Sequence, residues 1–107
     1  MREFEIKSLP GVTFREANVS PVDLLAIATQ VDFDAFSKTK ELFTFALEHV
    51  EANIDNKWFV VKHAGRDVYM PFGIEKNLVA LNEICEWYLT NVIAEVFTGS
   101  AESTKEI

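Results

Sequence analysis

The last long segment of the chain, residues 75–97, repeats its apolar side chains at steps of three and four. This spacing places the side chains on one face of a helix. That face carries Leu78, Leu81, Cys85, Tyr88, Val92 and Val96. Further apolar residues widen the arc beyond the stripe of a one-sided surface helix, namely Val79, Ile93 and Phe97. The segment therefore predicts a long helix that carries more apolar surface than one packed face needs.

Two earlier segments also predict helices. The first covers about residues 20–30, with Ser20 as the N-cap, Pro21 in the first turn and Asp23 completing a pattern like a capping box. The second runs from about Asp34 or Ser37 to Asn53. The apolar face of the first helix is formed by Leu24, Leu25, Ile27 and Ala28, and that of the second by Phe36, Phe43, Leu47, Val50 and Ile54.

Two β-hairpins are predicted by alternating polar and apolar residues on either side of a turn. Residues 2–9 and 12–17 flank the turn-forming pair Pro10–Gly11 near the N-terminus. Residues 57–63 and 66–70 flank a second turn, which contains a glycine. The second hairpin comes directly before the long C-terminal helix.

These elements predict an α+β fold, mainly helical, in a single domain. A chain of 107 residues has the length of one domain and can bury a core without disulfides or metals. The domain is expected to span residues 1–98. Residues 99–107 are small or polar and are expected to form a flexible C-terminal tail.

The charge of the chain limits its partners. It has 17 acidic and 10 basic residues, a net charge of −7, and no cluster of Lys or Arg. Binding to nucleic acid or to an anionic membrane needs such a cluster, so neither is expected as a partner. No apolar run approaches the roughly 20 residues of a membrane span, and no signal peptide is predicted. The acidity favours solubility or a basic protein partner.

Residues that could carry chemistry are few. His49 and His63 are the only histidines, and neither has a second His or Cys at the spacing of metal ligands. Cys85 lies on an apolar stripe, where a thiol acts as a small hydrophobe rather than a nucleophile. Glu83 and Glu86 share one helix face, which we interpret as solvated rather than as an acid–base pair. We therefore expect no catalytic site, no cofactor, no metal and no enzymatic activity.

Some aromatic residues lie off the predicted apolar stripes. Phe45 shares a helix face with charged residues, and Trp87 lies beside polar neighbours on the last helix. Two interpretations stay open: the hairpins cover this surface, or a partner or a second copy of the chain does. Apolar arcs on two faces of the last helix also favour helix–helix contacts between copies, which predicts a homo-oligomer. The candidate partner-binding residues are Phe45, Trp87, Val79, Ile93 and Phe97.

The stretch "NKWFVVKHAGRDVYMPFGIEKN", residues 56–77, followed by "ALNEICEWYLTNVIAEVFTGS", resembles the tail assembly chaperones of long-tailed siphophages. The order of parts is similar as well: an N-terminal strand segment, "SPVDLLAIA", an aromatic-rich helix, and a last helix that ends in "VF". The resemblance covers roughly residues 4–97. It depends on the order of the predicted elements and on short apolar sequence motifs, and not on a catalytic signature.

The resemblance implies a binding function. Proteins of this family bind the tape measure protein and keep its long, aggregation-prone helices soluble while tail tube subunits polymerise around it. Expected partners are therefore the tape measure protein and, as a further candidate, the tail tube protein. The expected location is the cytoplasm of the infected bacterial host, outside the mature virion. Many such phages also make a longer form by ribosomal frameshifting, and the short polar end of this chain would suit the short form.

A second hypothesis needs no resemblance. A small acidic adaptor or an inhibitor of the immunity type would use the same negative charge to block a basic site on a protein partner. The genes on either side would separate the two hypotheses. Tail tube and tape measure genes favour the chaperone, whereas a toxin or regulator gene favours the inhibitor.

Overall fold

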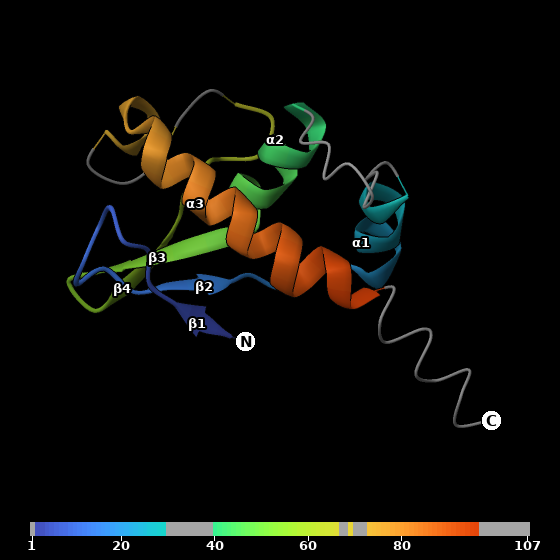
Figure 1. Cartoon of the computed structure of the whole chain (residues 1–107), viewed down its shortest axis with the longest axis horizontal. Helices are drawn as coiled ribbons and strands as arrows, with labels where there is room; N and C mark the ends of the chain where they lie inside the picture. The colour runs from blue at the N-terminus through green and yellow to red at the C-terminus, as the bar shows by residue number, and fades with distance from the viewer. Residues whose placement is uncertain (1, 30–39, 67–68, 70–72, 97–107) are drawn as a thin grey trace.

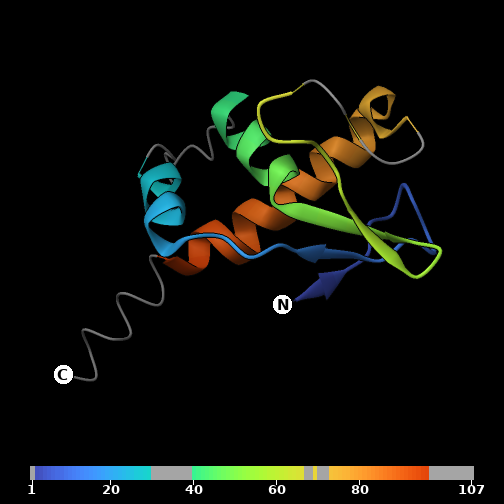
Figure 2. The same ribbon diagram turned by 180° about the vertical axis from the view of Figure 1, so that it is seen from behind.

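The computed structural model describes residues 2–29, 40–66, 69 and 73–96. These residues confirm the predicted α+β fold, with helices packed against one four-stranded antiparallel sheet. Figures 1 and 2 show α3 lying across the sheet, with α1 near the end of the helical run that continues α3 to residue 96. The elements are β1 (Glu3–Phe4), β2 (Phe14–Glu16), α1 (Pro21–Ala28), α2 (Lys40–Glu48), β3 (Val50–Ile54), β4 (Lys57–Val60), the 3₁₀ helix η1 (Ile74–Lys76), α3 (Leu78–Tyr88) and the π-helical turn η2 (Leu89–Ile93).

The two hairpins form one sheet in the order β1-β2-β3-β4. Phe4 pairs with Phe14, which pairs in turn with Ala52, so one row of apolar residues crosses the sheet. Phe14 and Ala52 are fully buried in the core. The neighbouring row carries Arg15 and Glu51, which form an ion pair at 2.7 Å. The alternation of the strands thus gives one face to the core and one to charged residues.

The helix predicted to reach Asn53 is wrong at its C-terminal end. The structure ends α2 at Glu48, and residues 50–54 form β3, which pairs with β2 and β4. Asp55 and Asn56 both have positive φ, 52° and 65°, as a two-residue hairpin turn of type I′ requires. The Asp-Asn pair therefore turns a hairpin here rather than ending a helix. The spacing of Val50 and Ile54 on the helical stripe was coincidental, because strand pairing with a distant segment decides their conformation.

The second hairpin lies earlier in the chain than predicted. Residues 57–60 pair with β3, and the Val61 N–H donates to the Val50 carbonyl at 2.9 Å. In the described part of the expected partner segment, one isolated bridge joins Lys62 to Tyr69. The rest of that segment, apart from Arg66, lies outside the described residues. Among the described residues, β4 therefore forms its ladder of hydrogen bonds with β3, the strand before it.

Helix α1 begins as predicted, with Ser20 at the N-cap and Pro21 in the first turn. The Ser20 side chain makes no capping hydrogen bond, so the predicted capping box does not form. Asp23 still places a negative charge in the first turn, where the helix dipole favours it. Of the predicted apolar face, Ile27 and Ala28 are buried, whereas Leu25 is 53% exposed.

The predicted C-terminal helix is divided into several pieces. Asn77 separates η1 from α3, and its side chain caps α3 by accepting the N–H of Ala80 at 3.1 Å. After Tyr88 the helix widens into the π turn η2, and residues 94–96 are helical again. A π turn takes more residues than an α turn, so it rotates the side chains that follow it. The helical pattern of the sequence is confirmed for Val92, which is buried, but it left Ile93 among the candidate surface residues, whereas Ile93 is fully buried.

Candidate functional site

An open groove of about 430 Å³ runs between α2 and α3, and we call it the α2–α3 groove. Its described lining residues are Lys40, Phe43, Thr44, Leu47, Tyr69, Leu78, Leu81 and Asn82. The residues from each helix are spaced by three or four positions, so each helix contributes one continuous face. Tyr69 adds an aromatic ring from the segment before η1. The groove is therefore apolar along most of its described length.

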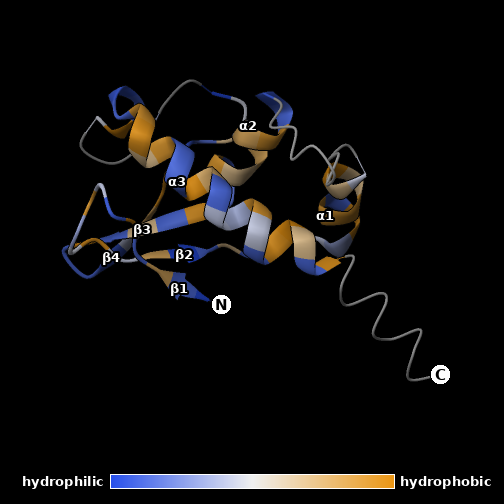
Figure 3. Cartoon of the chain, viewed as in Figure 1, coloured by the Kyte–Doolittle hydropathy of each residue, from blue (hydrophilic) through white to orange (hydrophobic). Residues whose placement is uncertain are grey.

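The first turn of α3 exposes large apolar side chains beside this groove. Leu78 is 76% exposed and Val79 is 64% exposed. Both side chains lie in the first turn of α3, directly after the Asn77 cap, and the short helix η1 before that cap leaves them exposed. Figure 3 shows this end of α3 as a hydrophobic segment at the edge of the molecule. Isolated exposed apolar residues are common, but a pair beside an apolar groove indicates a binding surface.

Two of the candidate partner-binding residues have other surroundings. Phe45 is half-buried, with its ring stacked on His49 at 4.2 Å and edge-on to Tyr88 at 6.0 Å. Ile93 is fully buried, so it belongs to the core of this chain and not to its surface. Of the remaining candidates, Val79 is exposed next to Leu78 in the first turn of α3, and Phe97 lies outside the described residues.

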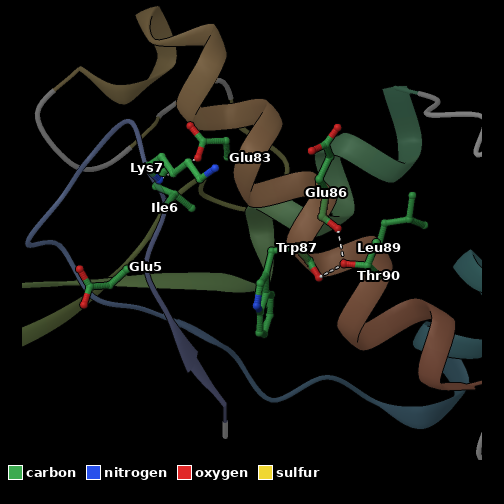
Figure 4. Close-up of a pocket in the computed structure, with 8 residues that line it drawn as sticks. All are labelled: Glu5, Ile6, Lys7, Glu83, Glu86, Trp87, Leu89 and Thr90. Carbon is green, nitrogen blue, oxygen red and sulfur yellow. Dashed lines mark hydrogen bonds between the residues drawn. The ribbon is translucent and has the colours of Figure 1, made fainter.

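Trp87 lines a different groove, of about 540 Å³, between the loop after β1 and α3. Figure 4 shows this groove with its described lining residues, Glu5, Ile6, Lys7, Glu83, Glu86, Trp87, Leu89 and Thr90. The indole ring stacks on Phe4 with 3.8 Å between ring centroids and 9° between planes. Arg2 lies 5.8 Å from the same ring. Trp87 therefore holds β1 against α3, which is a structural role.

The carboxylate of Glu83 is bound to the loop after β1. It accepts the backbone N–H groups of Lys7 at 2.8 Å and of Ser8 at 3.2 Å. These N–H groups hold the pKa of Glu83 below its ordinary value, because they stabilise the ionised form. A general acid needs a raised pKa. Glu86 is exposed, as predicted for both carboxylates, whereas Glu83 is a loop anchor.

Replacing Glu83 with glutamine should lower the stability of the chain at neutral pH, because the amide loses the charge that these N–H groups bind. The stabilisation by Glu83 is complete above the ordinary carboxyl pKa of 4.5 and is lost as the pH falls through the lower pKa of the folded state. Urea unfolding should therefore separate the E83Q variant from the native chain at pH 7, and the difference should shrink as the pH falls below the ordinary carboxyl pKa of 4.5. E75Q, at an exposed glutamate, is the control. Equal midpoints at pH 7 would contradict the anchor role.

The histidines and the cysteine take structural positions. His49 Nδ1 lies 2.7 Å from the Phe45 carbonyl oxygen, at the end of α2, and His63 is exposed. Cys85 is buried in the core, as its position on the apolar stripe predicted. Over the described ranges, no group of three or more His, Cys, Asp or Glu side chains could hold a metal ion. Within those same ranges, no helix has both the length and the apolar character of a membrane span.

The chain matches no protein-family model, no curated protein and no solved structure. What it binds is therefore inferred from its own surface. Sequence patterns placed Leu78 on the buried stripe and did not single out Lys40 or Tyr69. A signal for Leu78 was present, because Asn77 is a good N-cap and a cap there leaves the next residues in an uncovered first turn. Nothing in the sequence indicates that α2 lies beside this turn.

Proposed function

We propose that this chain is a binding protein of the tail assembly chaperone type, which keeps the tape measure protein soluble until tail tube subunits surround it. The observation that carries the proposal is the exposure of Leu78, 76%, at the rim of the α2–α3 groove. Exposed apolar side chains around a groove favour a partner that brings its own apolar surface. The sequence resemblance to the tail assembly chaperones points to the tape measure protein as this partner.

The shape of the groove favours a helical partner. Two helix faces form its walls, and Phe43 and Leu81 pack between them onto the core. A groove of this kind accepts the apolar stripe of an amphipathic helix, with residues at steps of three and four as anchors. The resemblance implies a client made of long helices that aggregate when unprotected. A net charge of −7 would keep such a complex in solution.

Co-expression tests the proposal directly. The tape measure protein from the same genome should become largely soluble when this chain is present and should remain bound to it during affinity purification. An unrelated acidic protein of similar size serves as the control for charge alone. A tape measure protein that stays equally insoluble, with no complex recovered, would rule out the chaperone function.

A further inference from the structure

We propose that Lys62 is a positioning residue for client binding, because its buried ammonium group fixes Tyr69 as part of the wall of the α2–α3 groove. Among the described residues, Lys62 is the one charged residue that is buried, with 6% of its surface exposed. Tyr69 lines the groove, and Lys62 forms an isolated β-bridge with it. The inference depends on the proposed function, since it concerns the same groove. It adds a residue that shapes this groove from outside its described lining.

The ammonium group of Lys62 is surrounded by groups from separate parts of the chain. Its Nζ donates to the carbonyl oxygen of Arg66 at 2.6 Å and lies 3.5 Å from Oε2 of Glu48. It also lies 5.8 Å from the centroid of the Tyr69 ring. Burial of a charge is costly unless the charge has partners of this kind. The lysine therefore holds a defined position, and these partners are held with it.

The same contacts join the segment after β4 to the last turn of α2. The backbone N–H of Lys62 donates to the carbonyl of Leu47 at 3.1 Å. The Glu48 carboxylate, which faces the lysine, also accepts the N–H of Gly65 at 3.3 Å. Leu47 itself lines the α2–α3 groove. Lys62 thus connects a helix that forms one wall of the groove to the segment that supplies Tyr69.

A tight turn brings the Arg66 carbonyl back to the lysine. The N–H of Arg66 donates to the His63 carbonyl at 3.1 Å, and Gly65 within this turn has a φ of 71°. Glycine adopts that conformation without steric cost. The lysine binds the backbone of Arg66 and not its side chain, which is exposed. The side chain of Arg66 can therefore be changed without removing the acceptor.

The position of Tyr69 depends on side-chain contacts more than on strand pairing. Within the described residues, one isolated bridge joins it to the segment after β4, and no ladder continues from that bridge. Its ring is partly buried against the core and faces the ammonium group, within the range of a cation–π attraction. Loss of the ammonium group should let this ring leave its place. The groove would then lose an aromatic contact, which is the kind that contributes most to binding.

A double-mutant cycle tests the inference. Peptides that tile the predicted helices of the tape measure protein serve as probes, and the tightest binder is used for fluorescence anisotropy with the full chain. Lys62→Met keeps a straight apolar side chain but removes its charge, and it should weaken binding of this peptide about fivefold. Tyr69→Ala should weaken binding about tenfold. In the double variant the loss should stay near tenfold, because the lysine acts through the tyrosine.

The control variants separate this role from charge and from stability. Arg66→Met also removes a positive charge from this segment but keeps the backbone carbonyl, so binding should be unchanged. Ile93→Ala weakens the core outside the groove lining and should leave binding by the folded chain unchanged. Glu48→Gln keeps an acceptor for the Gly65 N–H but not the charge beside the lysine. It should weaken binding about twofold, and it tests the inference even if Lys62→Met does not fold.

Other outcomes overturn the inference in distinct ways. Unchanged binding by Lys62→Met would show that the ammonium group does not shape the groove. A fivefold loss that persists in the Tyr69→Ala background would show that the lysine acts independently of the tyrosine. An equal loss in Arg66→Met would assign the effect to charge alone. If no tiled peptide binds the native chain, the proposed function fails as well, whereas the three preceding outcomes leave it standing.

Discussion

Replacing Leu78 with aspartate should remove most of the ability of this chain to keep the tape measure protein soluble, while the fold stays intact. Leu78 is 76% exposed, so the substitution gives up little buried area within the chain. Aspartate in the first turn of α3 also interacts favourably with the helix dipole, by about 0.3–1 kcal/mol. In the complex, however, the carboxylate would be buried against an apolar stripe. That burial should cost at least ~2 kcal/mol, which weakens binding about thirtyfold.

Val22→Asp is the matched control for this prediction. Val22 is also three-quarters exposed, at 75%, and lies in the first turn of its own helix, α1. Figure 1 shows α1 and the first turn of α3 at opposite ends of the molecule. The two variants therefore share charge change, exposure and helix position but differ in distance from the groove. Equal loss of soluble tape measure protein in both would mean that the α2–α3 groove is not the binding site.

Replacing Ile93 with alanine should lower the free energy of unfolding by about 2–5 kcal/mol, since it leaves a cavity in the core. Ile93 is fully buried within the π turn η2, together with Leu89 and Val92. Val79→Ala should change the free energy of unfolding by less than about 0.5 kcal/mol. Val79 is 64% exposed, so shortening its side chain removes few contacts within the chain. Urea unfolding monitored by circular dichroism measures both.

This pair of variants also separates stability from binding. Val79→Ala should weaken binding of the tape measure protein, whereas Ile93→Ala should affect binding only as far as the chain unfolds. The sequence placed both residues on the same widened apolar arc. A stable Ile93→Ala variant with an unchanged urea midpoint would contradict the π turn, since a continuous α-helix would direct that side chain elsewhere.

The candidate site could be predicted only in part. The apolar excess of the last helix pointed to a binding role, and Val79 was named among the residues that carry it. Ile93 was misplaced, because local periodicity does not reveal a π turn. The sequence left open whether the hairpins or a partner cover Trp87 and Phe45, and the structure stacks Phe4 of β1 on Trp87 and places Tyr88 edge-on to Phe45.

The amino-acid sequence by itself determined the α+β class and the start of α1 at Ser20 and Pro21. It also determined the alternation near the N-terminus that buries Phe4 and Ile6 and exposes the residue between them. These features follow from local preferences: proline fixes φ, and a period of two or of 3.6 sets which face is apolar. Only the tertiary structure decided that residues 50–54 form a strand and that Leu78 lies exposed beside a groove. Strand pairing and the cover of an apolar face depend on segments distant in the chain, which no local pattern can specify.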